Sequence, residues 1–183
     1  MIQGELIELR ELKLEDIDIL KEGLNTPDIM EQSGRIKVYS KADVEHWIRE
    51  SWNLINKKSE YVFGILKIKE KKFIGYIKIK ILNKQAKRGS ISIYIFSDEN
   101  RYKGFGSQSI NVLLEFVFKT LNLHSIQLLV FDTNIKALRC YKKVGFREVG
   151  KRRDSDYISG KYITDIVMDL LKKEWEEFNL NKL

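Results

Sequence analysis

Two glycines stand among basic residues where a strand pattern gives way to a helical one. This segment reads Arg101, Tyr102, Lys103, Gly104, Phe105, Gly106 and Ser107. Backbone N–H groups at a helix N-terminus lack intrahelical partners and lie at the positive end of the helix dipole, so they can hold a pyrophosphate where glycines let it approach. The pattern predicts an anion-binding turn. An ordinary strand-to-helix turn is the alternative, because two glycines at this spacing are a weak signal.

A second group of polar residues lies on a predicted helix over residues 135–143, which Gly145 ends. Asn134, Ala137 and Tyr141 fall on one face of that helix. An amide, a small side chain and a phenol along one groove wall suit an extended ligand. Taken singly, Asn134 also suits a helix N-cap and Tyr141 a core aromatic residue.

The sequence does not predict a metal site, an internal disulfide or a nucleotide-binding motif. His46 and His124 have no second ligand at metal spacing, so no metal site is predicted, and the one cysteine, Cys140, can form no internal disulfide. Neither the Walker pattern nor the six-residue dinucleotide fingerprint is present, which argues against nucleoside triphosphates and nicotinamide cofactors.

The apolar pattern predicts the elements that must position these groups. A period of two predicts strands over residues 5–12, 61–65, 73–81, 91–95, 125–131, 146–151 and 161–169. A helical period predicts helices over residues 15–24, 41–56, 104–121, 135–143 and 170–178. Ser40 and Asp43 form a predicted capping box for the second helix. Residues 25–39 are expected to form a loop, and Ser159 and Gly160 a turn.

Length and composition favour an ordinary globular protein. The chain has 183 residues, of which 43% are hydrophobic and 32% charged, so one domain over residues 1–183 is expected. The formal charge of +7 is spread along the chain, which suits an anionic small ligand as well as nucleic acid. No apolar run approaches the roughly 20 residues needed to cross a bilayer, and no secretory signal is evident. No membrane association and a cytoplasmic location are therefore expected.

In combination and in this order, the two groups of residues resemble the GNAT acetyltransferases, particularly the ribosomal-protein N-terminal (RimJ/RimL-type) branch. The resemblance extends from Ile7 to about Trp175. It implies that the segment from Arg101 to Ser107 cradles the pyrophosphate of coenzyme A. It also implies that the helix from Asn134 to Tyr141 borders the pantetheine arm.

The same resemblance implies roles near the reacting group. Asn134 would bond the pantetheine arm or an ordered water, and Tyr141 would be the general acid for the departing thiolate, since a phenol is neutral at pH 7 and able to donate. A main-chain N–H at the strand end formed by Ile95 and Phe96 would hold the oxyanion. Many relatives carry a glutamate on this strand, whereas this chain has Ser90 at the corresponding position.

Without that glutamate, the proton of the attacking ammonium needs another route, such as water or an acid from another loop. The acidic candidates are Asp28, Glu31, Asp154 and Asp156. Each is equally well explained as a solvated loop acid. They lie in residues 25–39 and 153–161, over which a cationic acceptor is expected to enter.

The resemblance implies an α/β (α+β) fold, with a mixed, mostly antiparallel sheet and helices on both faces. A cofactor cleft would lie between two splayed central strands that end near Phe96 and Phe131. The expected activity is metal-free transfer of the acetyl group of acetyl-coenzyme A to a primary amine by direct attack in a ternary complex. A protein N-terminus, a polyamine and an aminoglycoside-type acceptor all satisfy that description.

Two other functions stay open at the level of sequence. A non-catalytic acetyl-coenzyme A sensor is motivated by the missing strand glutamate. A basic nucleic-acid-binding domain is motivated by the excess of lysine and arginine, but no readout motif supports it. The family resemblance is compatible with a homodimer, on which the sequence itself is silent.

Overall fold

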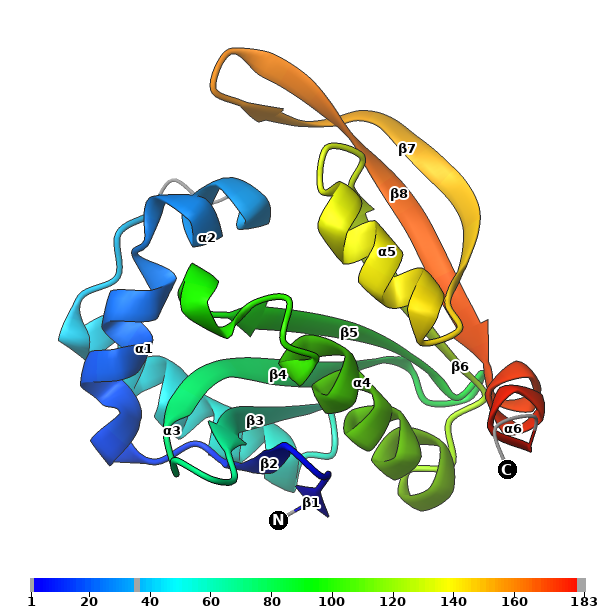
Figure 1. Ribbon diagram of the computed structural model, residues 1–183, viewed down its shortest axis with the longest axis horizontal. Coiled ribbons are helices and arrows are strands. Elements are labelled where there is room, and N and C mark those ends of the chain that lie inside the picture. Colours follow the sequence, from blue (N-terminus) through cyan, green and yellow to red (C-terminus); the bar gives the residue numbers. More distant parts are fainter. Residues whose placement is uncertain (1, 35–36, 181–183) are drawn as a thin grey trace.

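A computed structural model describes residues 2–34 and 37–180, and in that part of the chain the strands form one eight-stranded sheet (Figure 1). The strands are β1 (Ile2–Gln3), β2 (Ile7–Glu11), β3 (Glu60–Lys67), β4 (Phe73–Asn83), β5 (Arg88–Ile95), β6 (Ser125–Phe131), β7 (Arg147–Ile158) and β8 (Lys161–Leu171). Their order is β1-β2-β3-β4-β5-β6-β8-β7, and only β5 and β6 pair in parallel. The predicted mixed, mostly antiparallel sheet is confirmed.

Two helices cover one face of the N-terminal half of the sheet (Figure 1): α1 (Ile17–Leu24), entered through the 3₁₀ turn η1 (Leu14–Asp16), and α3 (Lys41–Asn56). The predicted capping box starts α3, because Ser40 Oγ accepts from the Asp43 N–H at 3.1 Å and the Asp43 carboxylate accepts from the Ser40 N–H at 2.9 Å. The apolar residues buried in this layer include Leu20, Leu24, Val44, Ile48, Val62, Tyr76 and Phe96.

A short helix occupies part of the expected loop over residues 25–39. This helix, α2 (Pro27–Ser33), has Thr26 as its N-cap and Gly34 as its C-cap, at φ 64°. Proline at the first helical position and glycine in the left-handed region at the end are ordinary helix boundaries. The loop prediction is wrong here because seven residues with Ile29 as their buried apolar contact are too few to show a helical period.

The other face of the sheet carries the larger core and the helices that border the cleft. Helix α4 (Phe105–Glu115) continues into a π-helical stretch, η3 (Phe116–Thr120), so the predicted helix over residues 104–121 is confirmed in extent. Helices α5 (Ile135–Lys143) and α6 (Lys172–Leu180) complete this layer (Figure 1). The core here includes Ile91, Ile110, Leu113, Val117, Phe118, Leu128, Val130, Val144, Ile166 and Met168.

The sheet opens between its two parallel strands. Strands β5 and β6 pair over three residues, from Arg88 opposite Ser125 to Ser90 opposite Gln127, and no further pairing continues the ladder within the described residues. Beyond this point the strands diverge toward Ile95 and Phe131. The expected splay between two central strands is confirmed.

The last two strands form a longer hairpin than expected. The predicted strands over residues 146–151 and 161–169 correspond to β7 and β8, but β7 extends to Ile158 through an irregularity between Arg152 and Asp156. Asp154 has a positive φ of 51° at this bulge. Residues 152–158, which lie outside both predicted strands, therefore belong to β7. The hairpin reaches beyond the body of the sheet to a turn above α2 in the view of Figure 1.

Candidate active site

A cleft of about 1050 Å³ lies at the opening between β5 and β6. Residues from α2, β5, β6, α5, the β7–β8 hairpin and the segment before α4 line it. Along β5, Ile91 packs into the core under α4, whereas Tyr94 packs with the layer of α1 and α3. Because neighbouring strand residues point to opposite faces, the cleft has two sides, one toward α4 and α5 and one toward α2 and the hairpin. They are called the donor side and the acceptor side below.

The donor side contains main-chain donors at the start of α4. Phe105, Gly106 and Ser107 form the first turn of this helix, so their N–H groups have no acceptor one turn earlier. Within the described segment from 102 to 108, the first backbone donor with a protein partner is Gln108, which donates to the Gly104 carbonyl at 3.0 Å. The space before these amides belongs to the cleft. The geometry suits an anionic group such as a diphosphate.

The two glycines of this segment serve different purposes. Gly104 is the N-cap of α4 and has φ 85°, a conformation that L residues rarely adopt. Gly106 is helical, and a Cβ built there would have one near neighbour, Ile95 Cγ1, at 3.9 Å. The protein's own packing therefore does not require glycine at 106, whereas close approach of a ligand to the backbone would.

Helix α5 forms the other wall of the donor side. Asn134 is its N-cap, with Oδ1 accepting from the Ala137 N–H at 3.1 Å, and both residues line the cleft. Basic side chains of this helix also line it: Lys136, Arg139 and Lys143. The Tyr102 hydroxyl raises the pKa of Lys136, whose Nζ lies 4.6 Å from the Tyr102 ring centre. Positive charge thus borders the donor side over about two turns of helix.

Tyr141 lies at the inner end of α5. Its side chain is buried at 9% exposure, lines the cleft, and packs edge-on against Phe146 with ring centres 6.0 Å apart. Burial, with smaller effects from Cys140 and Tyr94, raises the pKa of Tyr141 well above its ordinary value. The phenol therefore stays protonated throughout the physiological range and can act as a hydrogen-bond donor.

Cys140 also lines the cleft beside Tyr141. Burial raises the pKa of its thiol, with an opposing effect from Lys143. The thiol is therefore held in its protonated, weakly nucleophilic form, which does not favour covalent catalysis by this residue.

The carboxyl-terminal end of β5 presents backbone groups to the opening. The Phe96 N–H donates to the Ile74 carbonyl at 2.8 Å, toward β4. Because N–H groups alternate in direction along an antiparallel strand, the Ile95 N–H points away from β4, toward the opening. Ile95 lines the cleft, whereas the Phe96 side chain is buried in the layer of α1 and α3.

The acceptor side is acidic. Asp28 and Glu31 of α2 and Asp156 of β7 line it, as does Asp165 of β8, which sequence reasoning missed. Asp165 is 4% exposed, and one carboxylate oxygen lies 3.4 Å from Arg152 Nη1. The sequence does not reveal this residue, because a single acid within an apolar strand is ordinarily interpreted as a side chain that faces solvent.

The end of α2 lies close to the hairpin on this side of the cleft. A Cβ built on Gly34 would lie 3.4 to 3.5 Å from the side chains of Phe131, Asp156 and Ile158. A side chain at position 34 would therefore meet both β6 and the hairpin. Ser90, at the position of the strand glutamate in many relatives, also lines the cleft.

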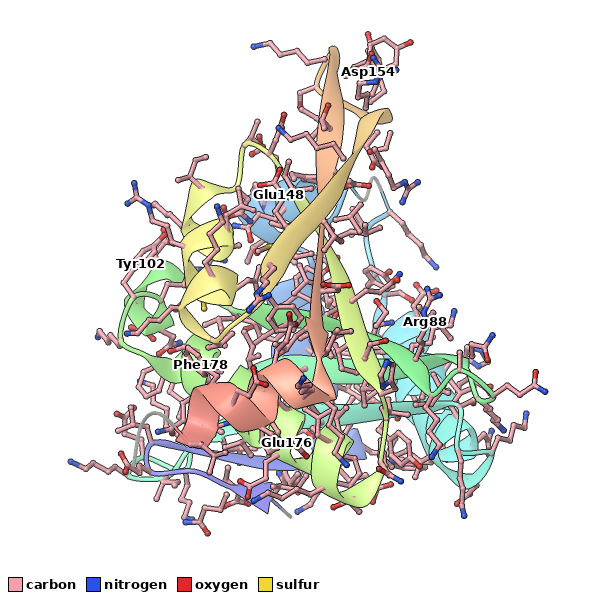
Figure 2. All side chains as sticks on the ribbon, turned by 90° about the vertical axis from the view of Figure 1, so that its right-hand side faces the viewer. Arg88, Tyr102, Glu148, Asp154, Glu176 and Phe178 are labelled. Carbon is pink, nitrogen blue, oxygen red and sulfur yellow. The ribbon has the colours of Figure 1, made fainter. Side chains whose placement is uncertain are left out.

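Four residues named from the sequence lie outside the lining of the cleft: Phe96, Lys103, Phe105 and Asp154. Figure 2 places Asp154 at the far end of the hairpin from α6 and its Phe178. Phe105 instead packs against the main core, with Lys67 Nζ 5.3 Å from its ring centre. The proximity of Asp154 to Asp156 in the sequence does not bring it into the site, because the bulge turns it outward.

Arg101 lines the cleft but is occupied by the protein itself. Its Nε and Nη2 donate to the Ile95 carbonyl at 3.1 and 3.0 Å, and its Nη1 donates to Asp98 Oδ1 at 2.9 Å. Nη1 also forms an ion pair with Asp28 of α2. The side chain is 15% exposed. These contacts differ from the expected position against a pyrophosphate.

A mixed sheet that opens between two parallel strands, with helix-start amides on one side and a buried phenol at the cleft's inner end, is the architecture that the resemblance to an acetyltransferase leads us to expect. The family model described as acetyltransferase (GNAT) domain matches residues 7–147. The chain therefore belongs to the GNAT acetyltransferase family, and the resemblance inferred from the sequence is confirmed.

Individual relatives agree with this assignment. The chain is 25% identical over 182 residues to a probable N-acetyltransferase of Bacillus subtilis, covering 97% of this chain and all of that one. The structure of spermidine N-acetyltransferase from Vibrio cholerae in complex with CoA and spermine has a TM-score of 0.85 at 26% identity, covering 94% and 99% of the two chains. A ribosomal-protein-S5-alanine acetyltransferase from Vibrio fischeri shares the fold, with a TM-score of 0.84 at 19% identity and coverage of 94% and 97%.

The part of the chain that the structure describes contains neither a metal-binding cluster nor a membrane-spanning helix. No group of three or more His, Cys, Asp and Glu side chains is arranged there to hold a metal ion. No helix among those residues has the length and apolar character needed to span a bilayer.

Proposed function

We propose that the protein transfers the acetyl group of acetyl-coenzyme A to a primary amine of a small polycation such as a polyamine. The observation that carries this proposal is the separation of charge across one cleft. Main-chain donors and basic side chains border the donor side, whereas carboxylates from α2 and the hairpin border the acceptor side. A polyanionic donor and a polycationic acceptor would each meet complementary charge.

The residues of the donor side fit coenzyme A. The free amides at the start of α4 and the open space at Gly106 suit a diphosphate that approaches the backbone. Lys136 and Arg139 can add charge-assisted contacts to phosphate groups. When bound, the coenzyme supplies an acetyl thioester as the acyl donor. Ala137 and Asn134 line the path from α4 to Tyr141 that its extended arm would follow.

The acceptor side favours a molecule with several ammonium groups. Asp28 pairs with Arg101, and Asp165 lies close to Arg152. Glu31 and Asp156 have no ion-pair partner among the described residues, and both line the cleft, one from α2 and the other from β7. The Vibrio cholerae relative was solved with spermine, a molecule of this class. Several carboxylates around one entrance suit such a molecule better than a single N-terminal ammonium.

The chemistry needs one proton donor and one proton acceptor. The neutral amine attacks the thioester carbon, a C–N bond forms and the C–S bond breaks. In this proposal the Ile95 N–H holds the carbonyl oxygen as it gains negative charge, and Tyr141 donates a proton to the departing thiolate. Because Ser90 cannot act as a base at neutral pH, the ammonium proton leaves to water in the cleft or to an acceptor-side carboxylate before the attack. After the attack the nitrogen loses a second proton to water, which replaces the proton that Tyr141 gives to the thiolate.

Acceptor profiling with radiolabelled acetyl-coenzyme A tests the proposal. The panel would contain spermidine, a monoamine of similar length, an aminoglycoside and peptides with free N-termini. We expect the highest kcat/KM for spermidine. Transfer to peptides alone would replace the polyamine with a protein acceptor, and tight coenzyme binding without turnover on any amine would favour a sensor.

A further inference from the structure

We propose that Arg101 is a positioning residue that fixes the open edge of β5 and makes its position depend on α2. Expectations based on sequence place this arginine against the pyrophosphate. Its contacts instead point away from phosphate binding and toward the Ile95 peptide. The consequence for catalysis rests on the proposed function, whereas the structural role does not.

The open edge of β5 creates the need for such a residue. Where β5 and β6 separate, the Ile95 carbonyl has no neighbouring strand to supply a donor. An unpaired, part-buried carbonyl costs free energy. Two nitrogens of the Arg101 guanidinium donate to this oxygen, at 3.1 and 3.0 Å. The planar fork of arginine therefore replaces the missing strand at the same residue whose N–H, in the preceding peptide group, should face the reacting carbonyl.

The backbone between Ile95 and α4 needs this restraint. Ser97, Tyr102 and Gly104 all have positive φ, of 60°, 61° and 85°. Two of these are not glycine, and such conformations persist only when surrounding contacts hold them. Besides Arg101, Asn100 anchors the segment, with Nδ2 donating to the Phe96 carbonyl and to Ser97 Oγ, each at 3.2 Å. Loss of the arginine should loosen the whole segment.

The same side chain joins the two sides of the cleft. Asp98 lies in the 3₁₀ turn η2 (Asp98–Asn100), on the way to α4, while Asp28 lies on α2 at the acceptor side. Arg101 Nη1 contacts both carboxylates. A shift of α2 when an acceptor binds would therefore be transmitted through one guanidinium to the Ile95 peptide. This contiguous set of contacts is a physical route for coupling between the two substrates.

A phosphate-binding role would require these contacts to break. Each of the three guanidinium nitrogens already contacts a protein oxygen, and the side chain is 15% exposed. Nearby Lys136 and Arg139 line the donor side with greater freedom to reach a phosphate. The two roles therefore make different predictions for a donor that has no diphosphate.

The test compares Arg101→Gln with wild type using two donors, acetyl-coenzyme A and S-acetyl-pantetheine, which lacks the diphosphate and adenosine. Because a displaced oxyanion donor affects both reactions, we expect kcat to fall about tenfold or more with each donor, by the same factor. Coenzyme A affinity, measured by calorimetry, should stay within about twofold of wild type. Arg101→Lys should recover part of kcat, since it keeps the charge and a donor but not the fork. Arg153→Gln, which removes an exposed arginine of the hairpin, is the matched control and should match wild type.

A loss confined to acetyl-coenzyme A and seen as weaker binding would overturn the proposal in favour of a phosphate ligand. Hydrogen–deuterium exchange gives a readout that does not need turnover. Arg101→Gln should speed exchange in residues 93–104 and in α2, whereas Asp28→Asn should do so mainly in α2. Unchanged exchange in both segments would also overturn the proposal. Failure of every amine to be acetylated, with faster exchange in Arg101→Gln, would count against the proposed function alone.

Discussion

The two sides of the cleft are built in different ways. The donor side consists of main-chain amides and one helix wall, within residues 101–107 and 134–143, and each stretch is continuous in sequence. The acceptor side is assembled from side chains of α2, β5, β6, β7 and β8. A ligand shared by a whole family can be held by backbone geometry. A ligand that varies within the family must be recognised by side chains, which can change without altering the fold.

This contrast predicts that changes on the donor side impair every acceptor equally, whereas changes on the acceptor side alter the choice among acceptors. The substitution expected to have the largest effect lies at the start of α4. Gly104→Asp places a carboxylate where a diphosphate is expected, and like charges in contact cost several kcal/mol, so coenzyme affinity should fall on the order of a thousandfold. Calorimetry with coenzyme A measures it.

Gly160→Asp is the matched control for that variant. Gly160 has φ 82°, close to the 85° of Gly104, but lies at the hairpin turn with nothing within 4 Å of an added Cβ. It should show a similar backbone penalty with unchanged coenzyme affinity. Equal affinities in both variants and wild type would remove the diphosphate site from α4.

Loss of the phenol should give the next largest effect. Tyr141→Phe keeps the packing against Phe146 and removes the proton donor, so kcat should fall about a hundredfold for every acceptor with little change in coenzyme affinity. Tyr157→Phe, on the exposed face of the hairpin, serves as the control. A kcat equal to that of wild type would assign Tyr141 to packing alone.

A change on the acceptor side should be smaller and selective. Asp165→Asn removes a buried carboxylate from the acceptor side while leaving Arg152, which is 56% exposed, solvated. We expect KM to rise about tenfold for spermidine, because one charge-assisted contact is lost, and less for a monoamine. Steady-state kinetics would be compared with Asp154→Asn, whose carboxylate lies outside the cleft. Equal increases for both acceptors would contradict the division of roles between the two sides.

The smallest expected effect concerns pH. Burial raises the pKa of Tyr141, so its protonated form, which donates, persists to higher pH than in a free tyrosine. The kcat should rise as the acceptor amine loses its proton and then stay level to about pH 10, near the ordinary tyrosine pKa. A falling limb centred below that pH would show that another group controls the reaction.

The sequence predicts the elements that border the donor side well for a physical reason. Strand β6 and helix α5 have the boundaries that apolar period and the cap signals indicate, because Gly145 and Asn134 mark the ends of a strongly amphipathic segment. The capping box at Ser40 likewise starts α3 where expected. Such local signals are enough to predict an element when one short stretch of sequence contains both the apolar period and the residues that cap it.

The acceptor side escapes such reasoning because its residues meet only in the folded protein. Helix α2 is too short for a period, and the bulge at Asp154 changes which hairpin residues point inward. Asp165 acquires its place from register, opposite Phe131 and Arg152. Arginine is a common phosphate ligand, yet the Arg101 side chain binds the Ile95 carbonyl, which has no strand partner. Strand register and the choice among hydrogen-bond partners depend on the whole folded sheet, so a short stretch of sequence does not reveal them.

The brief pairing of β5 with β6 has one more consequence. Residues 93–95 pair with β4 and residues 129–131 pair with β8, but neither segment pairs with a strand across the opening within the described residues. A slender molecule with amide groups of its own can enter this gap and complete the ladder as if it were an added strand. The arm of coenzyme A has two amides, so under the proposed function the donor would take the place of a missing piece of the sheet's backbone.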